Sequence, residues 1–260
     1  MNDDVRNIVL GVIATGIATA IGWCARTYLW RRRLRRKQRF FGLPDNSECL
    51  LVVNESAGGG GWSVARRDVF ALLELYALIK DCGANAEIVA HDAMRQGFGE
   101  RTEFCVGGPV SNQRMAAHLR TLLPGVQVDT SPERGPEQSA IRVGGQAYRW
   151  ERGVSEHVLL ARLTDGRTAP DARPVFLASG QHSNTNHAAV RYLARNYGKL
   201  MRKYGNEPFC LVLKVVNPDA YGPDVVELAA DVTRAALRPA PTPEPAPAPA
   251  PDPAPAADPG

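Results

Sequence analysis

The feature that most constrains this chain is an uncharged apolar segment close to its N-terminus. Residues 8–25 are 18 consecutive residues without a charged side chain. As an α-helix this segment is roughly 27 Å long at about 1.5 Å per residue, which is close to the thickness of the hydrocarbon core of a bilayer. We therefore expect residues 1–30 to form an N-terminal transmembrane anchor.

A dense basic run follows this segment. Residues 31–39 read RRRLRRKQR, whereas the seven residues before the segment contain two Asp and one Arg. Lys and Arg beside a membrane span stay on the cytoplasmic side, where they meet anionic lipid headgroups. We therefore expect a single-pass protein of the cell membrane, with its N-terminus outside, a basic juxtamembrane segment at 31–39 and its main domain in the cytoplasm.

A cleaved secretory signal is the main alternative to an anchor. Residues 18–20 (Ala-Thr-Ala) are small enough to precede a cut, but a signal peptide carries positive charge before its apolar core and this chain carries it after. Small residues at helical spacing would also let a second copy approach closely, so a homodimer through this helix is a further expectation. They are Gly11, Ala14 or Thr15, Ala18 and Gly22.

The positive net charge of the chain belongs to its juxtamembrane segment. The whole chain has 31 Lys and Arg against 27 Asp and Glu, but from Phe40 on there are 22 basic and 25 acidic residues. Nucleic-acid binding would need basic residues spread over a folded face, so we expect no nucleic-acid partner. The five cysteines form no CxxC pair and no Cys/His grouping at metal-site spacing, and we therefore expect no metal site.

The C-terminal segment, residues 239–260, is a near-alternation of Pro with Ala and a few polar residues. Such a segment lacks the backbone N–H groups that a helix or central strand needs, and it has no large apolar side chains to bury. We expect a disordered tail of polyproline character. Residues 40–238 remain, which is enough for one sizeable domain.

Short apolar strands and helices alternate along residues 40–238. The strands are expected at 48–53, 86–90, 102–106, 174–180 and 209–216, and the helices at 64–80, 111–123, 186–204 and 225–235. This pattern predicts an α/β fold, a Rossmann-like open, mostly parallel sheet with helices on both faces. Residues 140–150 and 157–163 break the rhythm, and we expect them to form a short β insertion or antiparallel strands at one edge of the sheet.

Three of the predicted strand-to-helix connections carry glycine and small polar residues: 54–61, 107–112 and 180–186. In open α/β sheets, ligands bind at the carboxyl ends of the strands, where helix N-termini point N–H groups at them. We therefore expect one crevice that binds a nucleotide or a similar small polar ligand. The candidate ligand-binding residues are Asn54, Ser56, Gly107, Gly108, Ser111, Asn112, Gly180, Gln181, Ser183 and Thr185.

None of these loops contains GxGxxG or the GxxxxGK[ST] phosphate loop, so the cofactor stays unknown. The layout is similar to that of nucleotide-handling Rossmann-like domains in general, and this similarity implies a fold class only. The alternative interpretation is that the glycines make tight turns and the polar residues cap helices.

Glu55 is the candidate catalytic residue. It would stand at the mouth of the crevice, where loss of water raises a carboxyl pKa and suits it to general acid/base chemistry. Asp68, in the following helix, is expected on the surface; the alternative is that its position near the helix N-terminus brings it to the loop. The primary hypothesis is a membrane-anchored sensor or signalling module. The alternatives are a hydrolase or glycosyl-transfer enzyme that acts on a nucleoside-type substrate through Glu55, and a non-catalytic interaction scaffold.

Overall fold

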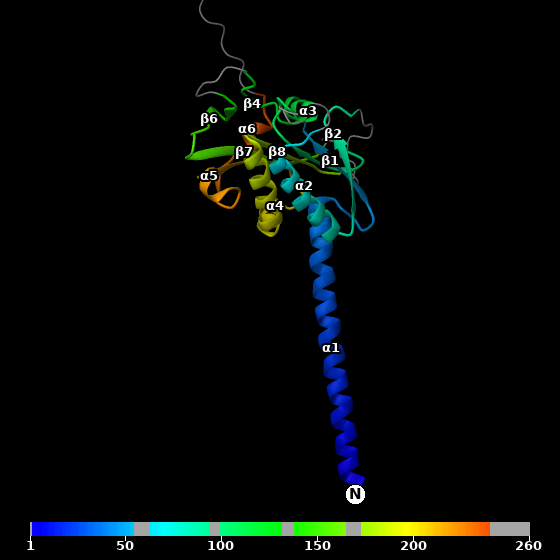
Figure 1. Cartoon of the computed structure of the whole chain (residues 1–260). Coiled ribbons are helices and arrows are strands. Elements are labelled where there is room, and N and C mark those ends of the chain that lie inside the picture. The colour runs from blue at the N-terminus through cyan, green and yellow to red at the C-terminus, as the bar shows by residue number, and fades with distance from the viewer. Residues whose placement is uncertain (1, 55–62, 94–98, 132–137, 165–172, 240–260) are drawn as a thin grey trace, which may run out of the picture.

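The computed structural model describes residues 2–54, 63–93, 99–131, 138–164 and 173–239. Within these residues a long N-terminal helix projects from an α/β domain (Figure 1). The helices are α1 (Asn2–Phe41), α2 (Arg66–Asp81), α3 (Gln113–Leu122), α4 (Ser183–Tyr204), α5 (Pro218–Tyr221) and α6 (Thr233–Ala236). The strands are β1 (Glu48–Val53), β2 (Asn85–Ala90), β3 (Thr102–Val106), β4 (Val126–Val128), β5 (Ile141–Val143), β6 (Gln146–Tyr148), β7 (Ser155–Leu163), β8 (Val175–Gly180), β9 (Phe209–Val216) and β10 (Val226–Asp231).

The helix α1 is a candidate membrane anchor by its length and composition. It is the one helix of the described chain that is apolar and long enough to cross a membrane, and none of its apolar window is buried in the protein. Large apolar side chains such as Ile8, Val12 and Ile21 are more than half exposed there. A surface of this kind is unstable in water and is well matched to lipid.

The C-terminal end of α1 is built into the core of the domain. Phe40 and Phe41 are completely buried, and their rings pack with those of Phe176 and Phe209. A Schellman motif ends the helix: the N–H of Leu43 donates to the Gln38 carbonyl and the N–H of Gly42 to the Arg39 carbonyl. Gly42 has φ +64°, a conformation that glycine adopts without strain.

The last carbonyl groups of α1 are buried, so other residues must satisfy them. Thr102 Oγ1 donates to the carbonyls of Phe41 and Gly42, and Arg162 Nε donates to the Phe40 carbonyl over 3.1 Å. Burial lowers the pKa of Arg162 to about 10. The guanidinium also lies over the Phe40 ring, so it binds the helix end by hydrogen bonds and cation–π contact together.

The main sheet is mixed, with the strand order β10-β9-β7-β8-β3-β1-β2. The four strands β2, β1, β3 and β8 are parallel neighbours, whereas β7 is antiparallel to both β8 and β9, and β10 is antiparallel to β9. The expectation of a mostly parallel sheet was therefore too simple. The predicted strand at 157–163 belongs to β7, which lies between β8 and β9 rather than at an edge of the sheet. All nine residues of β7 are buried, as is typical of a strand inside a covered sheet.

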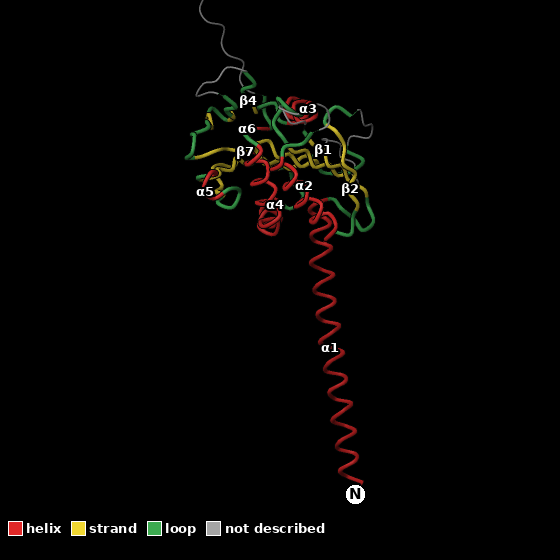
Figure 2. Tube along the Cα trace, viewed as in Figure 1, coloured by secondary structure: helices red, strands yellow, loops and turns green. Residues whose placement is uncertain are grey.

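Each face of the main sheet is covered. The helices α2 and α4 and the end of α1 share one hydrophobic core with the first face. The helix α3 and a separate three-stranded sheet, β4-β5-β6, share a second core with the other face (Figure 2). The inner strands β1, β8 and β9 are mostly buried and apolar on both sides for this reason, as expected from the sequence.

The prediction of a helix at 225–235 was wrong. Residues Val226–Asp231 form the edge strand β10, and only Thr233–Ala236 are helical. Apolar residues at 225, 228, 232 and 235 fit a helical face, but pairing with the free edge of β9 outcompetes that local pattern. Asp231 ends the strand, where its carboxylate accepts hydrogen bonds from Lys203, Tyr204 and Thr233.

Candidate functional site

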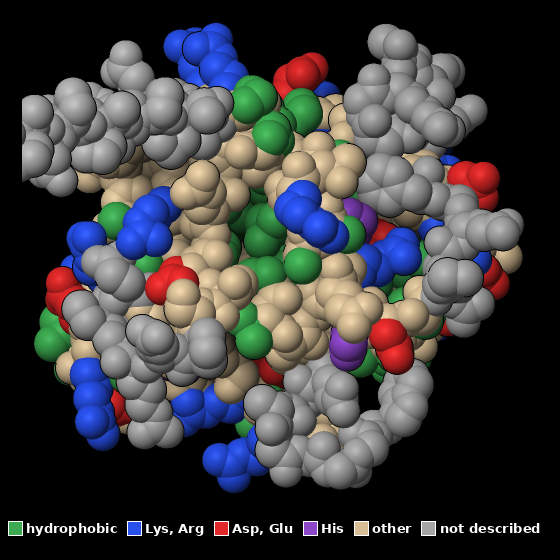
Figure 3. Space-filling model, turned by 90° about the horizontal axis from the view of Figure 1, so that it is seen from above, with side chains coloured by type: hydrophobic (Ala, Val, Ile, Leu, Met, Phe, Trp, Pro, Cys, Tyr) green, Lys and Arg blue, Asp and Glu red, His purple; other side chains and the backbone are tan. Residues whose placement is uncertain are grey.

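The carboxyl ends of β1, β3 and β8 border a cavity of about 340 Å³. The end of α1 lies at the opposite edge of the sheet, where Gly42 approaches Thr102 at the start of β3 and Pro174 just before β8. The cavity therefore lies on the side of the domain away from α1. That side, viewed from above, is hollowed near its middle (Figure 3).

Six of the ten predicted ligand-binding residues line this cavity, and they come from all three loops. They are Asn54, Gly108, Ser111, Gly180, Gln181 and Ser183. The loops also contact one another directly, since Asn54 Nδ2 donates to Ser111 Oγ over 3.3 Å. Ser56 and the catalytic candidate Glu55 lie outside the described residues.

The two glycine-bearing loops pack tightly together. A Cβ atom at Gly108 would lie 3.3 Å from the Gly180 carbonyl oxygen, and one at Gly180 would lie 2.1 Å from Thr185 Oγ1. Gly107 has φ +121°, and a Cβ there would meet the Asn54 side chain at 2.8 Å. These glycines are needed for backbone conformation and close approach in the described structure, whether or not a ligand is bound.

Several of the predicted polar residues form structural hydrogen bonds. Asn112 is the N-cap of α3: its Oδ1 accepts from the Met115 N–H and its Nδ2 donates to the Val106 carbonyl. Thr185 Oγ1 accepts from the His182 N–H and donates to the His182 carbonyl. Neither residue lines the cavity, so for these two the structure shows helix caps.

Gln181 lines the cavity, but its side-chain amide is fully engaged with the protein. Its Oε1 accepts from the His157 N–H over 2.7 Å, and its Nε2 donates to the carbonyls of Ser139 and Tyr148. These bonds join the end of β8 to β7 and to the small sheet. Gln181 therefore shapes the wall of the cavity.

Asp68 was expected on the surface, and this was wrong; the alternative, a position at the loop, is the one that the structure shows. It is the third residue of α2, it is 1% exposed, and it lines the cavity. Asn186 of α4 donates from Nδ2 to Asp68 Oδ1 over 3.0 Å and accepts from the Gly180 N–H. An acidic residue in the first turn of a helix after a glycine-rich loop is the sequence signal that could have found Asp68. Asn186 was missed because α4 begins three residues earlier than predicted, which turns this side chain inward.

Two buried acceptor atoms in the cavity wall have no hydrogen-bond partner among the described residues. They are Asp68 Oδ2 and Asn54 Oδ1, on side chains that are 1% and 8% exposed. Burial raises the pKa of Asp68, while hydrogen bonding from Asn186, the neighbouring Asn54 amide and the charge of His187 oppose that rise. A buried acceptor without a partner is costly, so these atoms mark the part of the wall where a ligand would gain most.

His182 forms another part of the wall and is paired with a buried acid. Its Nδ1 lies 3.3 Å from Oε1 of Glu156, which is 7% exposed and whose Oε2 has no hydrogen-bond partner among the described residues. Trp150 packs its ring edge-on against the imidazole, with 4.8 Å between centroids. Neither Glu156 nor Trp150 was a predicted site residue, because Trp150 ends the segment 140–150 and Glu156 lies just before the strand expected at 157–163, away from the three predicted loops.

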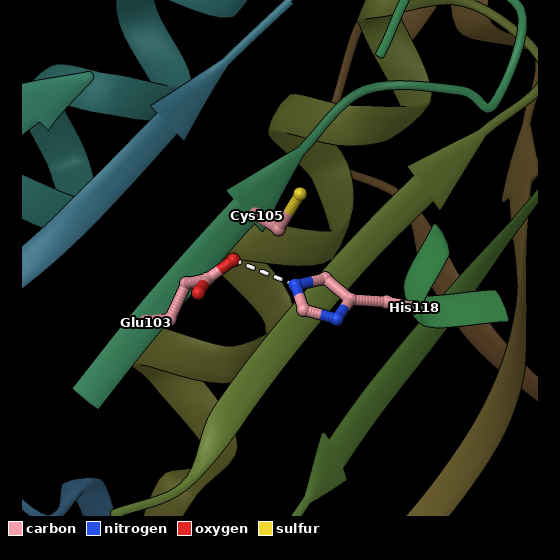
Figure 4. Close-up of side chains that lie close together, drawn as sticks. All are labelled: Glu103, Cys105 and His118. Atoms are coloured by element: carbon pink, nitrogen blue, oxygen red, sulfur yellow. Dashed lines mark hydrogen bonds and ion pairs between the residues drawn. The ribbon is translucent and has the colours of Figure 1, made fainter. Parts of the chain in front are cut away.

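Glu103, Cys105 and His118 form a second buried cluster between β3 and α3 (Figure 4). Their potential ligand atoms lie within 4.8 Å of one another, a spacing that could suit a metal ion. However, both oxygens of Glu103 already accept hydrogen bonds from Arg114, and one accepts from His118 at 2.7 Å. Burial raises the pKa of Cys105 and keeps it a neutral thiol. A cation would have to displace the guanidinium, so we interpret the cluster as an ion-pair network that joins β3 to α3.

No protein-family model, curated protein or solved structure matches this chain.

Proposed function

We propose that the domain binds a small polar molecule in the cavity at the carboxyl ends of β1, β3 and β8, and that it acts as a membrane-anchored sensor or signalling module. The observation that carries this proposal is the pair of buried acceptor atoms without partners, Asp68 Oδ2 and Asn54 Oδ1, in a cavity formed by three strand ends. A cavity of about 340 Å³ is at the lower end of the range of roughly 300–1,000 Å³ for small-molecule sites.

The strand order supports the position of the site. The parallel strands follow the order β2-β1-β3-β8, so the direction of winding reverses between β1 and β3. Open α/β folds, including Rossmann-like ones, bind their ligands in the crevice at this switch point. Asn54 directly follows β1 and Gly108 follows β3, which places both at that point.

A sensor is favoured because one helix contacts both the cavity and the anchor. Ser183 and Asn186, near the N-terminus of α4, line the cavity. Further along α4, the Tyr197 ring packs against that of Phe41 in α1, with 5.8 Å between centroids. Contiguous packed side chains are the kind of path that can couple two distant sites. In this proposal the basic segment at 31–39 keeps the domain in the cytoplasm, and the small residues of α1 allow a homodimer in the membrane.

The proposal is tested by mass spectrometry of small molecules that copurify with the full chain in detergent. Ala65→Leu, at the N-cap of α2, places a larger side chain in the cavity wall, and Ala77→Leu makes the same change at an exposed position within α2. We expect a molecule retained by the parent and by Ala77→Leu and lost from Ala65→Leu. If the parent retains none, or if both variants retain it equally, the cavity is not a ligand site and an interaction scaffold becomes the better explanation.

An enzyme is a second candidate. The observation that favours it is the Glu156–His182 pair, because Glu55, the catalytic residue expected from the sequence, lies outside the described residues. A carboxylate that holds Nδ1 of an imidazole leaves Nε2 to accept a proton from a bound hydroxyl group or water. Catalysis predicts that the parent converts its copurified molecule, while His182→Ala binds that molecule and leaves it unchanged. Recovery of the molecule intact after incubation with the parent would exclude this candidate.

A further inference from the structure

The hydrogen-bonding groups left free in the cavity define the chemistry of its ligand. Asn54 donates one N–H of Nδ2 to Ser111, and Asp68 accepts at Oδ1 from Asn186. The buried atoms of these two side chains without a partner among the described residues are both acceptors, Asn54 Oδ1 and Asp68 Oδ2. Gln181 uses both N–H groups of its amide on the protein, and Asn186 is held through its oxygen by Gly180 and through its nitrogen to Asp68. These two buried acceptors match hydrogen-bond donors on a ligand.

The charges of the wall point in the same direction. Two carboxylates, Asp68 and Asp129, line the cavity, and no Lys or Arg is among the described residues that do so. Hydrogen bonds from Ser131 lower the pKa of Asp129, so this exposed group is negative at neutral pH. Arg66 and Arg67 begin α2 but are exposed and do not line the cavity. The N-termini of α2 and α4 bring N–H groups to this cavity, but no basic side chain among the described lining residues neutralises a phosphate, which would meet two acidic side chains here.

The position of the cavity indicates how a ligand arrives. The cavity is at the edge of the sheet opposite the end of α1, and strands of six residues separate these edges by roughly 20 Å. With α1 in a bilayer, the opening faces water and lies beyond the reach of a lipid headgroup. A water-soluble molecule is the class that fits this access route.

We infer, on the basis of the proposed function, that the cavity selects a neutral polyhydroxylated molecule of monosaccharide or nucleoside size. Its hydroxyl groups donate hydrogen bonds to Asp68 Oδ2 and Asn54 Oδ1, as the adjacent hydroxyl groups of a ribose ring can. The site discriminates against the phosphorylated form of the same molecule. This excludes a nucleotide held through its phosphates, which was one form of the sequence-based hypothesis.

The test measures binding of ribose, adenosine, uridine, their 2′-deoxy forms and the two 5′-monophosphates to the full chain in detergent, by isothermal titration calorimetry. We expect ribose or a nucleoside to bind and its 2′-deoxy form to bind at least about tenfold more weakly, because a buried acceptor is left without its hydrogen bond. The 5′-monophosphate should also bind more weakly than its nucleoside, and this difference should shrink as salt is added.

Asp68→Asn tests the acceptor by changing the protein, since it replaces one carboxylate oxygen with an amide nitrogen at nearly constant side-chain volume. Asp81→Asn makes the same change on an exposed residue of the same helix and serves as the control. We expect Asp68→Asn to weaken ribose or nucleoside binding at least about tenfold and Asp81→Asn to leave it unchanged. If Asp68→Asn does not fold, which its melting curve will show, the 2′-deoxy comparison on the parent decides by itself.

The outcomes separate this inference from the proposed function. Equal binding of the 2′-deoxy forms, or tighter binding of the monophosphates, would overturn the inference while leaving the cavity a ligand site. The same conclusion follows if no member of the panel binds but another class of molecule copurifies and is lost in Ala65→Leu. If nothing binds and nothing copurifies, the proposed function fails, and the inference fails with it.

Discussion

Phe41→Ala tests the most consequential feature of the fold, the insertion of the candidate membrane helix into the domain core. The Phe41 side chain is completely buried. Its ring packs with those of Phe40, Phe104, Phe176 and Tyr197 at centroid distances of 4.9, 6.3, 5.5 and 5.8 Å. Truncating a buried Phe to Ala costs about 3–5 kcal/mol of unfolding free energy, and four aromatic neighbours place this site toward the upper value.

This loss is large on the scale of domain stability. A typical domain has an unfolding free energy of about 5–15 kcal/mol, so the variant would lose a third or more of it. For a domain of this size the melting temperature falls by roughly 2–4 °C per kcal/mol, which predicts a decrease of about 10 °C or more. The variant should also expose the chain between α1 and β1 to protease earlier, because the helix end would no longer be held in the core.

The measurement is pulse proteolysis of the full chain in detergent along a urea gradient, with the intact domain read on a gel. Trp30→Ala is the matched control, because this aromatic residue of the same helix is 61% exposed. We expect the control to keep the parent midpoint. An unchanged midpoint for Phe41→Ala would show that the end of α1 does not belong to the core of the folded domain.

Three further predictions address the buried network, the glycine contact and the topology. Glu103→Gln should cost about 3–5 kcal/mol, because it removes the buried charge that pairs with the half-buried Arg114. Asp81→Asn, which breaks an exposed pair with Lys37, should cost less than about 1 kcal/mol, and equal losses in urea denaturation would contradict the network. Burial alone would raise the pKa of Glu103, but hydrogen bonds from His118 and Arg114 outweigh burial and lower it. The stabilisation from this carboxylate is therefore present above the unfolded-state pKa of about 4.3, and it is lost as the pH falls through the lower folded-state pKa. The parent should therefore lose stability between about pH 5 and pH 3 more steeply than Glu103→Gln, and parallel curves would refute this. Gly180→Ala should lower the melting temperature, because its Cβ would lie 2.1 Å from Thr185 Oγ1. Gly198→Ala, in an open part of α4, should instead stabilise the domain by about 0.4–1 kcal/mol. The opposite order of the two melting temperatures would show that the loops are not packed as described. A reporter fused after residue 260 should be cytoplasmic and should become mixed in orientation when the arginines of residues 31–36 are replaced by neutral residues, and activity outside the cell in the parent would reverse the topology.

The sequence by itself determined the features that depend on local pattern. A long uncharged run with a basic flank identified the candidate anchor helix, since length and charge alone decide whether a helix is able to cross a bilayer. Apolar strands alternating with helices predicted an α/β fold with both faces of its sheet covered. The approach of the loops after β1, β3 and β8 was also predictable, because parallel neighbouring strands place their carboxyl ends at one edge.

Only the tertiary structure decided the features that depend on long-range pairing. Nothing local shows that β7 lies between β8 and β9, or that residues 226–231 pair with β9 instead of forming a helix. The position of Asp68 in the first helical turn after a glycine-rich loop allowed either a surface or a loop position. Its burial depends on a hydrogen bond from Asn186, 118 residues further along the chain. The partners of Glu103 and the core position of Phe41 were likewise set by neighbours distant in sequence, which periodicity within one segment does not encode.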